Sequence, residues 1–484
     1  MNQDLQTAAA LAIHELTFAS PAFLFAFMPA FFLAYYATPR AHRNLVLLLA
    51  SLSFYFANVG YGAWLLVASI GANWYFALAL ERARARGTAH ALLAAGILVN
   101  LLPLLYYKYW TFFAGVANDV GSLAGASSWR FEVASIPLLA GISFFTFQGI
   151  SYLVDVHQRL VQPAKRLVDF GMYHALFPQL IAGPIVRYGE IERSVFDRPV
   201  HWSDVHEGAA RFMIGLGKKI ILADSAGGIA DRIFALPPDQ WSTGVAWLGA
   251  GAYTLQILFD FSGYSDMAIG MGRMLGFRFP ENFDQPYRSK SITEFWRRWH
   301  MTLSRWFRDY VYFPLGGNRE GAGRTFANLF IVFFLCGLWH GAGWTFIAWG
   351  IYHGLLLVVE RLLRIRYGFV PSGIWGQVTT LFLVIIGWVI FRSPSLSAAL
   401  QFLHAMFAGN AVQPLFPVAF FLTPDKVVFL AAGVVVALAP FRIGEPLFAT
   451  LAKPLATVGA FIAFFYSLCL VAANGFNPFI YFRF

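Results

Sequence analysis

Two histidines stand out among the residues of this sequence that could do chemistry. His300 lies in the stretch FWRRWHMTLSRWFRDY, which begins at residue 295, and His340 lies in CGLWHGAGW at 336–344. A neutral imidazole can take a proton from a hydroxyl or thiol, so a buried histidine is a candidate general base. The oxyanion that develops in an acyl transfer needs a hydrogen-bond donor, which His300 or a glycine N–H of HGAG could supply.

Arginines and aromatic residues surround the first histidine. On a helix that turns about 100° per residue, the aromatic side chains and His300 fall on one arc and the arginines on another. Guanidinium groups suit the phosphates of a carrier such as coenzyme A, and aromatic faces suit the path of its pantetheine arm. An amphipathic helix that anchors at the lipid headgroups fits the same pattern and remains an alternative. We expect donor-binding or tunnel-lining roles for Arg297, Arg298, Trp299, Arg305, Trp339 and Trp344.

His340 is expected deep in the membrane. A straight helix that starts from the last arginine of the preceding basic loop, Arg324, would carry His340 about 24 Å inward at 1.5 Å per residue. An ionisable side chain at that depth is a candidate functional group, although a histidine satisfied within the core is the alternative. A hypothesis of another class is a proton-coupled transporter or flippase in which His340 and Asp266 form a proton path.

The composition predicts an all-α, polytopic membrane protein. Of the 484 residues 58% are hydrophobic and only 12% are charged, and the mean hydropathy is +0.60. Apolar runs long enough to cross a bilayer recur from residue 18 to residue 474, and they predict roughly 11 to 13 helical segments. We expect a short N-terminal extension at 1–17 and a single membrane domain at 18–484, with a catalytic block at 281–350.

The placement of the basic residues predicts the orientation. Lys and Arg outnumber Asp and Glu by 35 to 25, and the excess returns after every second span, as cytoplasmic loops do. The N-terminus is therefore expected on the periplasmic side, and the charge is not interpreted as a nucleic-acid-binding surface. Cys336 and Cys469 both lie in apolar runs and suggest neither a disulfide nor a metal site. We expect no bound metal, no bound cofactor and no nucleic-acid partner.

Three segments break the apolar runs: 177–190, 259–287 and 336–344. Irregular backbone at membrane depth is tolerated only where it is buried or lines a cavity, so a central cavity is expected. Tyr264 and Asp266, in the second segment, are candidates for its lining, with simple hydrogen bonding of a kink as the alternative. The glycines of the third segment could equally serve helix packing alone.

The histidine blocks resemble a known family. PENFDQPYRSKSITEFWRRWHMTLSRWFRDYVYFPLGGNR and FFLCGLWHGAGWTFIAWGIYHG are similar to the membrane-bound O-acyltransferase (MBOAT) family. FLFAFMPAFFLAYYATP, LFPQLIAGPIVRY, DFSGYSDMAIG and NPFIYFRF resemble its bacterial alginate O-acetylase branch. The likeness runs from about residue 18 to residue 484.

The resemblance implies helices around a central funnel and tunnel, with His340 as the catalytic histidine and His300 as its companion. It also implies a bacterial inner-membrane enzyme that takes acetyl from acetyl-CoA, or from an acyl carrier protein, in the cytosol. The acetyl group would pass to a periplasmic SGNH-type acetyltransferase partner that modifies alginate or a similar exopolysaccharide. Acetylation of cellulose or peptidoglycan and D-alanyl transfer to teichoic acid stay open as alternatives.

Overall fold

Helices make up the regular structure of the described part of the chain. A computed structural model describes residues 16–83, 87–124, 131, 136–409, 415–439, 453–474 and 477–480. Within these residues, five helical stretches are long and apolar enough to cross a membrane: Arg40–Ala83, Ala89–Leu123, Gly321–His340, Trp344–Tyr367 and Gly373–Arg392. The prediction of an all-α, polytopic membrane protein is confirmed. Most of the expected N-terminal extension lies outside the described residues.

The chain packs as two compact units, which are described separately. Unit 1 comprises Met1–Val205 with Met271–Pro280, and unit 2 comprises His206–Gly270 with Glu281–Phe484. Unit 1 contains α2 (Met28–Ala37), α3 (Arg43–Val59), α4 (Ala63–Ala83), α5 (Ala89–Leu104), α6 (Trp110–Leu123), α7 (Ile142–His157), α8 (Leu167–Ala175), α9 (Phe177–Leu180) and α10 (Tyr188–Phe196).

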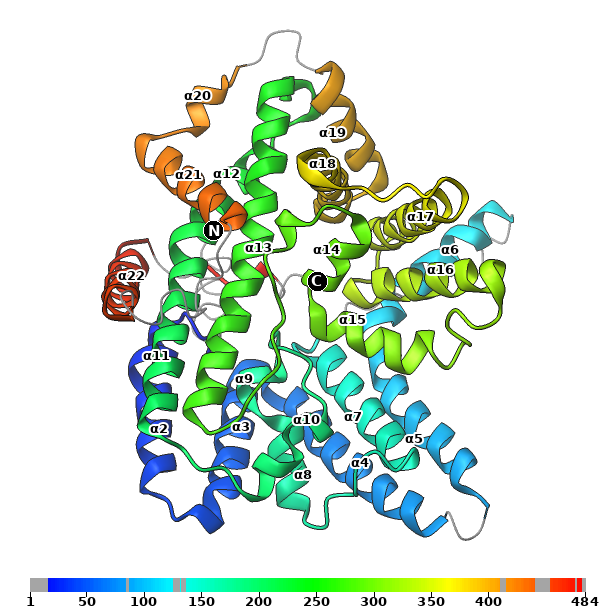
Figure 1. Ribbon diagram of the computed structural model, residues 1–484, viewed down its shortest axis with the longest axis vertical. Coiled ribbons are helices and arrows are strands. Elements are labelled where there is room, and N and C mark those ends of the chain that lie inside the picture. Colours follow the sequence, from blue (N-terminus) through cyan, green and yellow to red (C-terminus); the bar gives the residue numbers. More distant parts are fainter. Residues whose placement is uncertain are drawn as a thin grey trace. The chain divides into compact units, whose positions relative to one another are not determined.

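Helices α4, α5 and α7 of unit 1 pack against one another (Figure 1). Asn73 and Asn100 pair their amides across α4 and α5, with N···O distances of 3.0 and 2.8 Å. Gly149 of α7 lets the pair approach, because a Cβ there would lie 2.5 Å from Asn100 Oδ1. On the outside, Leu33 and Trp64 are exposed, as expected for side chains that face lipid.

Unit 2 carries both candidate histidines. Its elements are α11 (Trp202–Gly217), η6 (Lys218–Ala223), α12 (Asp224–Phe234), η7 (Pro238–Gln240), α13 (Thr243–Met274), η8 (Pro286–Arg288), α14 (Ile292–Arg298), α15 (Met301–Phe307), η9 (Arg308–Tyr312), α16 (Gly321–His340), α17 (Trp344–Tyr367), α18 (Gly373–Arg392), α19 (Leu396–Ala408), α20 (Val418–Phe421), α21 (Pro424–Leu438) and α22 (Lys453–Asn474). The first residues of α11 and the last turn of α13 belong to unit 1.

Helices α16 and α17 form a close antiparallel pair (Figure 1). A Cβ on Gly337 would lie 2.4 Å from Phe346 O, and a Cβ on Gly350 would lie 2.3 Å from Phe333 O. Only glycine permits this approach, so the small residues do serve helix packing. The predicted break at 336–344 is limited to residues 341–343, because α16 continues through His340.

The predicted break at 259–287 is wrong for its first half. Helix α13 continues without interruption to Met274, and the irregular segment begins only after it. Gly263 serves packing instead, because a Cβ there would lie 2.7 Å from Gly215 O on α11. Glycines that allow two helices to touch leave the same mark in a sequence as glycines that interrupt a helix.

Candidate active site

Residues 295–310 do not form the single amphipathic helix that the sequence predicts. Helix α14 ends at Arg298, α15 begins at Met301, and His300 stands between them with φ 42° and ψ 54°. A residue in the left-handed region ends a right-handed helix, so the aromatic and basic arcs do not continue through this point. A backbone bond from Met301 N to Asn282 O, 2.9 Å long, supports the corner.

The start of α14 is fixed by two side chains. Ser291 accepts from Glu294 N at 3.1 Å as the N-cap. The buried carboxylate of Glu360 on α17 accepts from Ile292 N at 2.8 Å and from Thr293 N at 3.4 Å. A carboxylate at a helix N-terminus satisfies free N–H groups and complements the helix dipole. The histidine corner is thereby anchored to a long helix of the same unit.

His300 is fully buried at the corner between α14 and α15. Its Nδ1 lies 3.1 Å from Asn282 Oδ1, and its ring meets Phe261 edge to face, with 4.7 Å between centroids. Burial lowers the pKa of His300 to about 3. The imidazole is therefore neutral at physiological pH, which is the form that can accept a proton or a hydrogen bond.

His340 is the last residue of α16, so the helix that follows the basic loop runs without interruption up to this histidine. The residue is 5% exposed, and its ring meets those of Trp349 and Phe391 edge to face, with centroids 5.0 and 5.3 Å away. Gly341 follows it without a side chain, because a Cβ there would lie 2.3 Å from the ring of Phe346. Aromatic walls thus enclose the end of α16.

Trp339 links the two histidines. Its ring centroid lies 5.8 Å from that of His300 and 4.9 Å from that of His340, both in edge-type contacts. Residues 40 positions apart in the sequence are therefore brought to one buried aromatic side chain. The sequence predicts both histidines and Trp339 as site residues, and the structure brings these three together.

The candidate donor-binding arginines differ in their surroundings. Arg297 is exposed, and Arg305 is partly buried. Arg298 binds Glu294 Oε1 through Nη2 at 2.8 Å and lies 3.7 Å from Asp284 Oδ2. Since two carboxylates already face Arg298, Arg297 is the better placed of this adjacent pair to meet a phosphate from solution.

The candidate aromatic residues also separate into two groups. Trp299 is buried against Trp388 and Phe283, with ring centroids 4.8 and 5.0 Å away. Trp344 opens α17 and is 53% exposed. The structure therefore places Trp299 in the packed interior of the unit and Trp344 at its surface.

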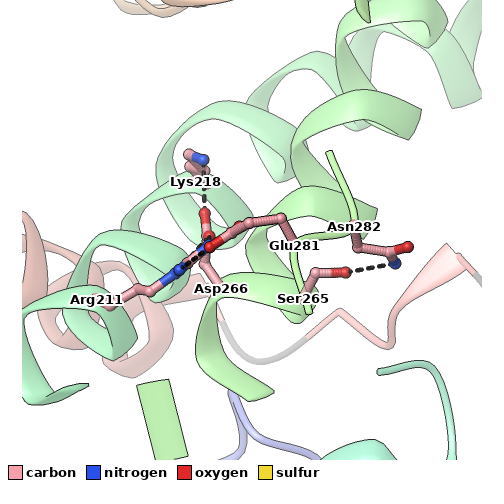
Figure 2. A network of polar contacts seen from close by, with 6 residues as sticks. All are labelled: Arg211, Lys218, Ser265, Asp266, Glu281 and Asn282. Atoms are coloured by element: carbon pink, nitrogen blue, oxygen red, sulfur yellow. Dashed lines mark hydrogen bonds and ion pairs between the residues drawn. The ribbon is translucent and has the colours of Figure 1, made fainter. Parts of the chain in front are cut away.

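Tyr264 and Asp266 lie on the continuous helix α13, away from any kink. Tyr264 is buried and meets Phe479 edge to face at 4.7 Å. Asp266 accepts from Arg211 Nε at 3.0 Å and from Lys218 Nζ at 2.6 Å, while Arg211 also binds Glu281 (Figure 2). Both carboxylate oxygens of Asp266 thus face cations, an arrangement that holds a structural ion-pair network together.

That network borders the residue that sequence reasoning missed, Asn282. Asn282 directly follows Glu281 and donates from Nδ2 to Ser265 Oγ at 3.1 Å (Figure 2). It is fully buried, and its Oδ1 faces His300. Nothing in the sequence marks it, because its partners on α13 and α15 come together only in the folded chain.

A third histidine, His353, lies in the same aromatic cluster. It is fully buried on α17, and its ring contacts those of Trp349 and Trp296, with both centroids 5.1 Å away. Neither of its ring nitrogens has a hydrogen-bond partner among the described residues. Trp349 therefore touches both His340 and His353.

A second polar cluster of unit 2 lies around Lys219. Lys219 Nζ binds Asp224 at 2.6 Å and Asp260 at 2.8 Å, and Asp260 Oδ2 accepts from Ile480 N at 2.7 Å. A small cavity borders this cluster, lined also by Gln256 and Asn477. Among the described residues, no group of three or more His, Cys, Asp or Glu side chains is arranged to hold a metal ion.

Comparison with known proteins connects these features to a family. The sequence profile of the MBOAT, membrane-bound O-acyltransferase family matches residues 140–400, which include both histidines. The chain is 45% identical to a probable alginate O-acetylase of Azotobacter vinelandii, over 81% of this chain and 78% of that one. It is 44% identical to a probable alginate O-acetylase of Pseudomonas aeruginosa, over 82% and 76%.

A third relative carries a different name. The chain is 36% identical to a peptidoglycan O-acetyltransferase of Helicobacter pylori, over 83% of this chain and 82% of that one. All three relatives are O-acetylating enzymes by name, and all three are matched over most of their length. The chain belongs to the membrane-bound O-acyltransferase family, and it is an O-acyltransferase.

Proposed function

We propose that this protein takes an acetyl group from acetyl-CoA on the cytosolic side of the bacterial inner membrane and passes it to a periplasmic acetyltransferase partner. Alginate or a similar exopolysaccharide would be the polymer finally modified. The polymer is inferred from the two alginate O-acetylases, which are more similar to this chain, at 45% and 44% identity, than the peptidoglycan enzyme at 36%.

The observation that carries the chemical proposal is the pair of buried histidines on either side of Trp339. His340 is the general base: it takes the proton from a hydroxyl of the acceptor as that oxygen attacks the thioester carbonyl carbon. The tetrahedral intermediate then collapses, the C–S bond breaks, and the leaving thiolate receives the proton from the imidazolium of His340. The aromatic walls around His340 exclude water, which limits hydrolysis of the thioester.

The donor would be held at the arginines near the corner. Arg297 is exposed and provides a guanidinium group for a phosphate of coenzyme A. Arg305 is the second candidate, while Arg298 holds the corner through Glu294. The orientation that we propose puts these arginines on the cytosolic side and the N-terminus on the periplasmic side, in line with the basic loops. Reporter fusions at the N-terminus test this orientation.

The first experiment uses purified protein in lipid nanodiscs with radiolabelled acetyl-CoA, and follows loss of thioester and transfer of label to a co-purified periplasmic partner. The wild type is expected to consume acetyl-CoA, and His340→Ala is expected to lose this turnover. His404→Ala, which changes an exposed histidine on α19, is the matched control and should keep it. If the wild type neither binds nor consumes acetyl-CoA, the proposed donor is wrong and an acyl carrier protein becomes the donor to test.

A further inference from the structure

The side chain of Asn282 joins two segments at the histidine corner. Its Nδ2 donates to Ser265 Oγ on α13 at 3.1 Å. Its Oδ1 accepts from Thr302 Oγ1 at 2.9 Å and from Thr302 N at 3.3 Å, and it lies 3.1 Å from His300 Nδ1. Asn282, Ser265, Thr302 and His300 are all at least nine-tenths buried.

These contacts fix the orientation of the Asn282 amide. A backbone N–H can only donate a hydrogen bond, so the atom that faces Thr302 N must be the amide oxygen and cannot be the NH₂ group. The Ser265 hydroxyl, which faces the NH₂ group, is able to accept. The amide therefore has one consistent orientation, with Oδ1 toward His300.

The orientation of the amide determines the tautomer of His300. Because Asn282 Oδ1 only accepts, the Nδ1 atom opposite it must carry the proton. In a neutral imidazole the other nitrogen then has a lone pair and no proton. His300 Nε2 is buried and has no hydrogen-bond partner among the described residues, so it is an acceptor that the protein itself leaves unused.

We propose that Asn282 is a positioning residue that holds His300 as the Nδ1–H tautomer, so that His300 Nε2 accepts a hydrogen bond from an N–H or O–H group of a bound substrate. This inference rests on the proposed function of the histidine pair. It excludes the role of oxyanion donor for neutral His300, which the sequence alone leaves open, because Nε2 has no proton to donate. The low pKa of His300 agrees, since burial disfavours the doubly protonated ring.

A purely structural role for Asn282 makes a different prediction. The backbone bond from Met301 N to Asn282 O supports the corner and persists whatever the side chain. If the amide served folding alone, its loss would lower stability and leave the tautomer of His300 unchanged. The tautomer is thus the readout that separates the two roles.

The test is nitrogen NMR of ¹⁵N-histidine-labelled protein in nanodiscs, with the His300 signals assigned by their loss in His300→Asn. The wild type is expected to show a protonated Nδ1 and an unprotonated Nε2. Asn282→Leu is expected to move the proton to Nε2, at least in part. A wild type that carries the proton on Nε2, or an Asn282→Leu variant with an unchanged tautomer, would overturn the proposal.

Two further variants provide controls. In Asn282→Asp the carboxylate still accepts from Nδ1–H, and the Ser265 hydroxyl can donate to its second oxygen, so the wild-type tautomer is expected to return. Asn328→Leu removes another fully buried asparagine, which donates to the carbonyls of Leu315 and Gly317. It should lower stability and leave the His300 signals unchanged.

Turnover of acetyl-CoA gives a second readout. Asn282→Leu is expected to lower kcat by up to about 10²-fold, which the displacement of a group that contacts the substrate can cost, and Asn282→Asp should recover most of this loss. An equal loss of turnover in Asn328→Leu would mean that the effect is structural. Because the NMR measurement needs no substrate, it decides the tautomer even if acetyl-CoA proves to be the wrong donor.

Discussion

His300 and His340 stand at two differently built places in unit 2. His300 is a corner residue with a positive φ, and the amide of Asn282 faces its Nδ1. His340 ends a regular helix, and the rings of Trp349 and Phe391 stand edge-on to it. Hydrogen bonds determine which nitrogen of His300 carries the proton, and aromatic rings pack around His340.

The difference fits the roles that we propose for the two histidines. An imidazole fixed as one tautomer suits a constant role, such as accepting one hydrogen bond, because changing the tautomer would break the bond to Asn282. A ring held by apolar walls keeps its place while its proton comes and goes, which a general base must do. The following predictions test this comparison, from the largest expected effect to the smallest.

Replacing the His340 ring is expected to have the largest effect. His340→Asn should lower acetyl-CoA turnover by about 10²- to 10⁴-fold, the usual contribution of a general base. Steady-state kinetics measure the loss, with His404→Asn as the matched control. Asparagine tolerates the left-handed backbone at position 300. His300→Asn should therefore lose less turnover than His340→Asn. The reverse order would contradict the proposed roles.

Adding a side chain at Gly341, next to the Phe346 ring, should have the second largest effect. Gly341→Ala places a methyl group 2.3 Å from the Phe346 ring, so the ring must move, at a cost of about 1–3 kcal/mol. Gly343→Ala is the matched control, because its Cβ would be 3.4 Å from the same ring, an ordinary contact. Thermal unfolding in nanodiscs measures stability. Equal unfolding temperatures for Gly341→Ala and Gly343→Ala would show that the Phe346 ring moves aside at little cost.

The pH dependence of stability should reveal the buried, neutral state of His300. Its folded pKa of about 3 lies below the ordinary value of 6.5, so below pH 6.5 the unfolded chain binds a proton that the folded chain does not. Stability is therefore lost as the pH falls from 6.5 toward 3, by no more than about 1.4 kcal/mol per pH unit. His300→Asn should show a weaker loss between pH 6.5 and 5. Identical pH profiles for the wild type and His300→Asn would indicate that water or a substrate group solvates the His300 imidazole in the folded protein.

Weakening the ion-pair network around Asp266 should have the smallest effect. Lys218→Met removes one of two cations from Asp266, and Arg211 stays bound to it. Because Lys218 is partly exposed, the expected loss of stability is about 1 kcal/mol, with turnover little changed. Lys219→Met, one residue along, leaves Asp224 and Asp260 without their shared cation and should cost more. Chemical denaturation of both variants measures the difference.

Much of this molecule can be predicted from local patterns in the sequence. Apolar runs of bilayer length predict the spans, and the glycines after His340 predict the end of α16. The corner at His300 could not be predicted, because a helical arc of aromatic residues looks the same whether or not one residue adopts a positive φ. The contacts of Asn282 and Arg211 could not be predicted from the sequence either, because their partners come close only in the folded chain. Gly263 led to the wrong prediction of a helix break, because this glycine allows close packing inside a continuous helix.

The bond from Ile480 N to Asp260 has a consequence for the order in which this protein is assembled. The two residues are 220 positions apart, whereas Asn282 is only 17 residues from Ser265 and 20 from Thr302. During synthesis the histidine corner can therefore close soon after α15 has emerged, because short loops cost less entropy to close. Asp260 receives this donor only after 220 further residues have been made, whereas its partner Lys219 precedes it in the chain. The docking of residues 477–480 onto Asp260 is thus expected to follow the closure of the histidine corner.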